Sequence, residues 1–295
     1  MAKVFLVGMA TVDFVLSVGE FPNAAEKYTA QDARVVGGGC AANAAVAIVK
    51  LDGDATLAAR LGDDSLADSI VADLAAEGVR TDFLQRSPGA RSSFSSVLLD
   101  KRGARQIVNF RGSGLTEKTD WFSRAPEVDA ILVDTRWTAG ALAALQMAKK
   151  RGIHGIVDAE APTDPVILAR ASHVAFSRQG LLSLTTETDL ARALKEIGEQ
   201  VPGWVCVTDG ENGVYYATDT GIEHISAFKV EIRDTLGAGD IWHGAFALRL
   251  GEGATEAEAI VFANAAAALK CMIFGGRSGC PNRSDTEKFL GENSP

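Results

Sequence analysis

The strongest chemical signal in the sequence is a glycine-rich turn. Residues 234–240 have the sequence Asp-Thr-Leu-Gly-Ala-Gly-Asp and directly precede a predicted helix. Small residues at a helix start leave backbone N–H groups unpaired, and the helix dipole adds partial positive charge there. Such a turn can hold the negative charge that develops during phosphoryl transfer, and Asp240 can take a proton from an attacking hydroxyl. Taken alone, the pattern describes an ordinary helix N-terminus equally well.

A second glycine-rich turn lies nearer the N-terminus, where residues 36–43 have the sequence Val-Gly-Gly-Gly-Cys-Ala-Ala-Asn. Its three consecutive glycines, Gly38 in the middle, allow a ligand to approach the backbone closely. Asn43 follows about one turn into the next predicted helix, where its amide can bind a ligand. The structural alternative is a tight turn in which Asn43 only satisfies local backbone groups, and on these residues alone that alternative is slightly favoured.

Several other chemistries are excluded. The sequence has no GxxxxGK[ST], no GxGxxG after its first predicted strand and no GxSxG. A net charge of −9, from 29 Lys and Arg against 38 Asp and Glu, argues against nucleic-acid or acidic-membrane partners. Cysteine usage favours a reducing compartment, so we expect a cytoplasmic protein. No zinc-site or catalytic-triad spacing is found among the cysteines and histidines: Cys40, Cys206, Cys271, Cys280, His154, His173, His224 and His243.

Neither long apolar stretch predicts a membrane span. Met1–Val18 has a single basic residue, Lys3, and Asp13 interrupts its apolar run after about ten residues, which is too short to cross a bilayer. Residues 257–274 are interrupted by Glu258, Asn264 and Lys270. We therefore expect a buried first strand and a core helix in these places.

The elements that must position the two turns alternate between strand and helix. The strands are short, apolar and β-branched, which suits a parallel sheet covered on both faces, so the sequence predicts a doubly wound α/β domain. Asp63 or Asp64 is expected to cap one helix that Gly78 ends. The expected strands are 4–8, 55–60, 130–134, 155–158, 174–176 and 204–208, and the expected helices are 41–51, 64–77, 139–151, 190–200, 238–250 and 255–273.

Two stretches, 14–36 and 92–109, break this alternation with period-2 patterns and polar turns. Residues 93–99 and 104–110 predict a hairpin joined at 100–103. We expect a small β-sheet lid, formed by about 14–36 and 92–110, over the strand ends of the main sheet. No repeat or linker divides the chain, so residues 1–295 form one domain.

The two turns together resemble the two signatures of the ribokinase-like (PfkB) carbohydrate kinases, in order and spacing, across essentially the whole chain. The resemblance implies that Asp240 activates a sugar hydroxyl, with ATP as phosphoryl donor and Mg²⁺ accompanying it. It implies an anion hole formed by the amides of Gly237, Ala238 and Gly239. It also implies sugar contacts from Asp13, Gly38 and Asn43, and nucleotide contacts from Thr208, Gly210 and Asn264 near the adenine.

One departure from the family pattern concerns the metal. Where the family often has Asn-x-x-Glu after a strand, this chain has Ser177-Arg178-Gln179-Gly180. The carboxylate that usually organises the water shell of Mg²⁺ is missing there, so we assign no metal ligand from the sequence.

The acceptor must be distinguished by residues near the lid and the strand ends. Arg136 follows the apolar strand 131–133 and is expected at a strand end, where open α/β sheets bind ligands. With Lys27 and Asn109 from the lid, it would suit a tetrahedral oxyanion on the substrate. The alternative is that Lys27 and Arg136 are exposed charges on unrelated loops.

Within the family, the chain is similar to the sulfofructose kinases, in residues 26–28, 36–39, 134–137, 268–271 and 275–279. This resemblance implies phosphorylation of 6-deoxy-6-sulfofructose at its 1-hydroxyl, with Lys27, Asn109 and Arg136 binding the sulfonate. The alternatives are a kinase of a 6-phosphoketose (fructose 6-phosphate or tagatose 6-phosphate), a neutral-sugar fructokinase or ribokinase, and a non-enzymatic sugar or nucleotide sensor. Lid-mediated dimers occur in the family, so we expect a homodimer.

Overall fold

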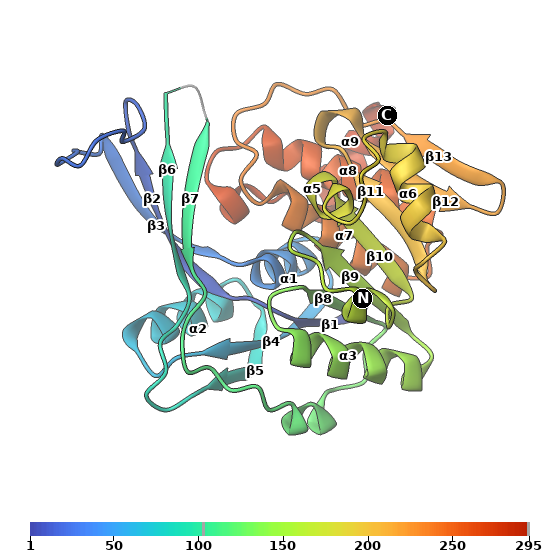
Figure 1. Ribbon diagram of the computed structural model, residues 1–295, viewed down its shortest axis with the longest axis horizontal. Helices are drawn as coiled ribbons and strands as arrows, with labels where there is room; N and C mark the ends of the chain where they lie inside the picture. Colours follow the sequence, from blue (N-terminus) through green and yellow to red (C-terminus); the bar gives the residue numbers. More distant parts are fainter. Residues whose placement is uncertain (102–103, 294–295) are drawn as a thin grey trace.

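The computed structural model describes residues 1–101 and 104–293, and its centre is a twisted sheet of nine strands (Figure 1). The seven neighbouring strands from β11 to β5 run parallel, whereas β12 and β13 form an antiparallel edge. The expected mostly parallel, doubly wound sheet is therefore confirmed. In spatial order the strands are β13 (Gly221–Ile225), β12 (Val214–Thr218), β11 (Trp204–Thr208), β10 (His173–Ser177), β9 (His154–Ala159), β8 (Ala130–Asp134), β1 (Lys3–Val7), β4 (Asp54–Leu61) and β5 (Arg80–Arg86).

Helices cover both faces of this sheet. Successive side chains of a strand point to opposite faces, so Val4 and Leu6 of β1 enter one hydrophobic core while Phe5 and Val7 enter the other. Helices α1 (Cys40–Lys50), α2 (Ser65–Ala76), α7 (Ala238–Gly251) and α8 (Glu256–Cys271) line the first core. Helices α3 (Thr138–Arg151), α4 (Pro165–Leu168), α5 (Arg178–Leu182) and α6 (Leu190–Gly198) line the second, and α9 (Arg283–Glu292) packs against α8.

The predicted ends of α2 are confirmed in detail. Asp64 is its N-cap, with the carboxylate accepting a hydrogen bond of 3.0 Å from the Ala67 N–H. Gly78 follows the helix with φ of 83°, the left-handed geometry that glycine adopts at little cost. The same carboxylate accepts the Ser92 N–H at 2.7 Å, so this cap also joins α2 to the segment that enters the second half of the lid.

A separate sheet of four strands forms the lid, in the order β3 (Asp32–Gly38), β2 (Thr11–Ser17), β6 (Phe94–Leu99) and β7 (Arg105–Phe110). It extends away from the main sheet on the left of Figure 1. The predicted lid is present, but β2 starts at Thr11, directly after β1, and 18–31 is an irregular segment rather than a strand. The expected hairpin of β6 and β7 is found, and its turn includes residues 102–103, which lie outside the described residues.

The elements that the sequence did not predict are β5, the β12–β13 hairpin, the short helices α4 and α5, and α9. Strand β5 and the hairpin lie at the edges of the sheet, where one-sided burial leaves a polar pattern without a continuous apolar run. Several predicted helices end a residue or two away from the observed bounds. Among the described helices, none has the length and apolar character that crossing a bilayer requires.

Candidate active site

The glycine-rich turn 234–240 forms the N-terminus of α7. Gly237 is the N-cap residue with φ of 78°, which favours glycine, and a Cβ at Gly239 would meet only open space. Within the described chain, the N–H groups of Gly237 and Gly239 have no hydrogen-bond partner, whereas the Ala238 N–H donates to the Thr235 carbonyl at 3.2 Å. Two free amides at a helix N-terminus can receive an anion. Ala238 would first have to give up its hydrogen bond.

Asp240 lies in the first turn of α7 and is held by the second glycine-rich segment. The Asn43 Nδ2 donates to Asp240 Oδ2 at 2.7 Å, which joins α1 to α7 across 197 positions of sequence. Burial, with the negative charges of Asp158 and Glu160, raises the pKa of Asp240 to about 7, while Asn43 and His243 act in the opposite direction. A carboxylate with such a pKa is matched to proton transfer near neutral pH.

Gly38 and Asp13 are in direct contact beside this pair. A Cβ at Gly38 would lie 2.2 Å from Asp13 Oδ2, so the carboxylate occupies the space that only glycine leaves. Burial raises the pKa of Asp13, while hydrogen bonding to Ser95 and the charge of Arg277 oppose the shift. Within the described residues, the buried atoms Asp13 Oδ1 and Asn43 Oδ1 have no hydrogen-bond partner. Because such atoms are costly to bury, both are suited to accept hydrogen bonds from a bound polyol.

A cavity of about 620 Å³ opens on the other side of the turn and has the size of a cofactor site. Thr208 and Gly210, after β11, line one part of it, and Ala238 and Gly239 line another, so the cavity leads to the free amides. Asn264 lines it too, but its amide already accepts the Trp242 Nε1–H at 2.8 Å and donates to the Ser226 carbonyl at 3.2 Å. Asn264 therefore shapes the wall of this cavity by fixing Trp242.

Further carboxylates, which the sequence analysis did not identify, surround Asp240. Asp134 ends β8, Asp158 lies on β9 and Glu160 follows it, so neighbouring parallel strands bring them to one edge of the sheet. Burial, with the charges of Glu160 and Asp134, raises the pKa of Asp158 well above its usual range. The signal in the sequence was an acidic residue at the end of two consecutive predicted strands.

The missing family carboxylate has a steric explanation. A Cβ at Gly180 would lie 1.9 Å from the Ala159 carbonyl oxygen, so this backbone admits no side chain there. Ser177 caps α5 instead, its hydroxyl accepting the Gly180 N–H at 3.0 Å. The nearby Cys40 thiol has a pKa that burial and the charges of Asp240 and Asp158 raise well above the usual range.

Three residues were expected to recognise an anion on the substrate. Two of them, Asn109 and Arg136, lie beside the sugar site in the structure. Asn109, on β7, donates to the Ser95 hydroxyl at 3.1 Å, and Ser95 pairs with Asp13 on the next lid strand, so Asn109 lies in the same cross-strand row as Asp13. Arg136 follows β8, as expected, but its guanidinium is ion-paired with Glu160 and donates to the Ala161 carbonyl at 2.9 Å. Lys27 is exposed on the segment 18–31, at the free end of the lid (Figure 1).

Two further arginines lie beside Arg136. A small cavity is lined by Arg60, Arg111 and Arg136 together with Met9 and Ala10, which connect β1 to the lid strand that carries Asp13. Arg60 ends an expected strand, so the argument from strand ends that identified Arg136 applied to it as well. Its guanidinium stacks on the Trp137 ring at 5.0 Å and is ion-paired with Glu117.

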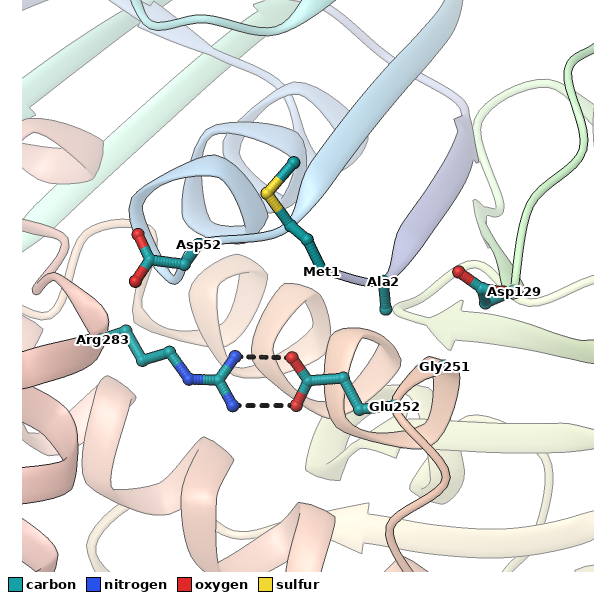
Figure 2. Close-up of a pocket in the computed structure, with 7 residues that line it drawn as sticks. All are labelled: Met1, Ala2, Asp52, Asp129, Gly251, Glu252 and Arg283. Carbon is teal, nitrogen blue, oxygen red and sulfur yellow. Dashed lines mark hydrogen bonds and ion pairs between the residues drawn. The ribbon is translucent and has the colours of Figure 1, made fainter.

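A second large cavity, of about 650 Å³, lies beside the N-terminal ends of β1, β4 and β8 (Figure 2). Its charged groups already bind one another: Arg283 contacts the Glu252 carboxylate through two hydrogen bonds of 2.5 and 2.9 Å, and Asp129 accepts the Lys3 N–H at 2.7 Å. These contacts join α9, α7 and the start of β1, so this cavity has a structural role.

A buried carboxylate and free amides at one helix N-terminus, beside a cofactor-sized cavity, define a phosphotransferase that acts on an alcohol group. Comparison with known proteins supports the same class of enzyme. Residues 1–283 match the model of the pfkB family carbohydrate kinases, and the chain belongs to this family. It is an ATP-dependent carbohydrate kinase that uses ATP and Mg²⁺.

Relatives and solved structures cover nearly the whole chain. A Bacillus subtilis ribokinase is 28% identical over 98% of this chain and 100% of its own length. A Vibrio alginolyticus fructokinase is 29% identical over 86% and 92%. The crystal structure of a protein described as a putative ribokinase from Agrobacterium tumefaciens is 34% identical and superposes with a TM-score of 0.92 over 99% of this chain and 98% of that one. These comparisons do not distinguish the acceptor sugar, and none of these relatives is a sulfofructose kinase.

Proposed function

We propose that this kinase phosphorylates the 1-hydroxyl of an anionic ketose, with 6-deoxy-6-sulfofructose as the best candidate. The observation that carries the proposal is the gathering of Arg60, Arg111 and Arg136 around one small cavity next to the lid strand of Asp13. Arginine is the side chain best suited to bind a tetrahedral oxyanion. The carboxylate now paired with Arg60 is 67% exposed, so it can turn into solvent when an acceptor anion arrives.

The proposed chemistry follows from the positions of the side chains. Asp240 takes the proton of the attacking hydroxyl, and the Gly237 and Gly239 amides, joined by that of Ala238, stabilise the charge on the transferred phosphoryl group. Asp13 and Asn43 orient the acceptor through their unpartnered oxygens, and Gly38 leaves room for Asp13. This orientation is a large part of catalysis, because phosphoryl transfer requires little covalent chemistry from the protein.

The nucleotide would occupy the cavity lined by Thr208, Gly210 and Asn264, with its phosphates toward Gly239. When bound with ATP, Mg²⁺ supplies the positive charge that offsets the phosphates. The donor set fits such an ion: Mg²⁺ prefers oxygen ligands and retains water molecules, and carboxylate oxygens of Asp158 and Asp240 lie within 4.8 Å of each other. Glu160, at the edge of this group, would hold the ion through its water shell.

The pH dependence follows from the pKa of Asp240. This pKa is raised to about 7, so the base is lost by protonation as the pH falls through that value. We expect kcat/KM for the acceptor to be constant at higher pH and to fall about tenfold per unit below the pKa. Initial rates at saturating Mg·ATP, over a pH series with constant ionic strength, measure this. A profile without decline down to about pH 5 would show that the base has an ordinary carboxyl pKa.

The acceptor is tested by measuring ADP release with Mg·ATP and equal concentrations of 6-deoxy-6-sulfofructose, fructose 6-phosphate, fructose or ribose. Because one or two charge-assisted hydrogen bonds distinguish the sulfonate from fructose, we expect 6-deoxy-6-sulfofructose to exceed fructose in kcat/KM by about 10- to 100-fold. If fructose 6-phosphate is preferred, the anion pocket stands and the acceptor is a 6-phosphoketose. If fructose or ribose is preferred, the anion pocket is wrong and the kinase acts on a neutral sugar, as the names of its relatives suggest.

The same panel on Arg136→Ala separates anion recognition from general damage. The variant should lose most of its preference for the sulfonate while keeping its activity on fructose. Arg170→Ala, at an exposed position, is the matched control. Equal losses on both acceptors would contradict anion recognition by Arg136. Lys27→Ala should give the same selective loss only if the free end of the lid moves to the acceptor.

We also infer a homodimer formed through the lid. The lid exposes Val35 (67%) on β3 and Val108 (69%) on β7, its two edge strands, and apolar β-branched residues on a sheet are suited to pack against another sheet. Sedimentation velocity tests this, and a mass of one chain at micromolar concentration would contradict it. We further propose that the kinase is cytoplasmic, where ATP is available. Cell fractionation tests this location.

A further inference from the structure

The molecule contains a fully buried ammonium group that the proposed reaction does not use. Lys270 lies in the last turn of α8, and its side chain is 0% exposed. Taking a lysine charge out of water is costly unless it is paired and hydrogen-bonded. A buried lysine in this position therefore requires a structural or functional reason.

The surroundings of Lys270 consist of oxygen acceptors that match an ammonium ion. Its Nζ donates to the Asp234 carbonyl at 2.8 Å, to Asp234 Oδ2 at 3.2 Å and to the Ile273 carbonyl at 3.2 Å. Three acceptors correspond to the three N–H bonds of a charged lysine. The C-terminal end of α8 adds partial negative charge. Such a set of oxygens would also suit a small monovalent cation.

Asp234 connects this ammonium to the turn that carries the anion hole. Its Oδ1 accepts the Leu236 N–H at 2.8 Å, and its Oδ2 accepts the Gly275 and Gly276 N–H groups at 3.0 and 2.9 Å. Although burial opposes it, these hydrogen bonds and the charge of Lys270 lower the pKa of Asp234. The Asp234 carboxylate is thus ionised, and hydrogen bonds from Leu236, the two glycines and Lys270 hold it in place.

The segment after α8 is in turn packed beside Gly237. A Cβ at Gly237 would lie 3.8 Å from the Arg277 backbone N, which directly follows the two glycines that Asp234 binds. The Asp234 N–H also donates to the Cys271 carbonyl at 3.1 Å. One network of contacts therefore holds the turn that carries the Gly237 and Gly239 amides. It consists of Lys270, Asp234 and the segment 271–277.

We propose that Lys270 is a positioning residue, a covalently attached cation that fixes the anion-hole turn, so that this kinase needs no dissolved monovalent cation. Without the ammonium, the two carbonyls and the Asp234 carboxylate would face one another uncompensated, and the turn would relax. Because phosphoryl transfer depends on donors in fixed positions, such a relaxation lowers turnover more than substrate binding. The inference concerns the kinase reaction itself and holds for any acceptor.

The test compares Lys270→Ala with Lys270→Met, using whichever acceptor the unmodified kinase turns over fastest. A displacement of about 1 Å in such a site can cost about 10²-fold, so we expect kcat to fall by roughly this factor in both variants, with KM values changed little. In Lys270→Ala the vacated space is lined by oxygens, so ammonium, methylammonium or K⁺ should restore much of kcat. In Lys270→Met the side chain fills that space, and the same salts should restore nothing.

Matched controls define the outcome. Lys288→Met removes an exposed lysine from α9 and should leave kcat unchanged, and circular dichroism and thermal unfolding establish that each variant is folded. A folded Lys270→Ala with kcat within about twofold of the unmodified enzyme would overturn the proposal. So would a folded Lys270→Ala whose lost activity no cation restores.

If Lys270→Ala does not fold, the unmodified kinase still decides the question. Its activity should be the same when tetramethylammonium, Na⁺ or K⁺ is the only added monovalent cation at constant ionic strength. A several-fold activation by K⁺ would overturn the proposal. This measurement is independent of the acceptor panel, so a wrong acceptor and a wrong role for Lys270 give different results.

Discussion

Asp240→Asn is expected to lower kcat by about 10²- to 10⁴-fold while leaving the binding of ATP and acceptor close to that of the unmodified enzyme. The substitution keeps the shape of the side chain, and its amide oxygen can still accept the hydrogen bond of 2.7 Å from Asn43. It removes only the ability to accept the proton of the attacking hydroxyl. Steady-state turnover, with dissociation constants for both ligands measured by calorimetry, gives the two quantities separately.

The stability of the same variant provides a second readout. Because the pKa of Asp240 is raised to about 7 in the folded protein, its charge opposes folding at pH 8. Asp240→Asn should therefore have a higher Tm than the unmodified protein at pH 8, with the difference shrinking as the pH falls below 7. Asp219→Asn, at an exposed position, is the control and should change neither turnover nor Tm. Unchanged turnover in Asp240→Asn would remove Asp240 from the mechanism.

The main fold was accessible from the sequence because its signals are local. Both faces of β1 are buried, so it appears as an uninterrupted apolar run, and the cap of α2 by Asp64 depends on residues three positions apart. The parallel pairing of β2 with β6 was not accessible. It joins Asp13 to Ser95, 82 positions along the chain, and no local pattern encodes that register.

The site shows the same division. Asp240 and Asn43 could be identified because each lies in a glycine-rich turn next to a helix start. The acidic surroundings of Asp240 could not, since Asp158 and Glu160 reach it only through the order of β8, β9 and β10 in the sheet. Lys270 interrupted an apolar stretch, but only the folded chain shows that its ammonium meets Asp234.

Gly38→Ala is expected to impair use of the acceptor strongly, with little effect on the nucleotide. A Cβ at this position would lie 2.2 Å from Asp13 Oδ2, far closer than van der Waals contact allows, so the carboxylate must move. Asp13 is half-buried in a cross-strand row of lid residues with Ser95 and Asn109, so its movement disturbs that row. We expect kcat/KM for the acceptor to fall by about 10²-fold or more, since misplaced orienting groups cost this much.

Because neither Gly38 nor Asp13 lines the nucleotide cavity, the dissociation constant of ATP should stay within about twofold in Gly38→Ala. Gly291→Ala is the matched control: a Cβ there meets open space near the end of α9, and alanine favours helix, so neither activity nor stability should decrease. The pair of variants separates steric displacement of Asp13 from a general effect of replacing glycine. If Gly38→Ala kept its acceptor kcat/KM, Asp13 would have no part in orienting the sugar.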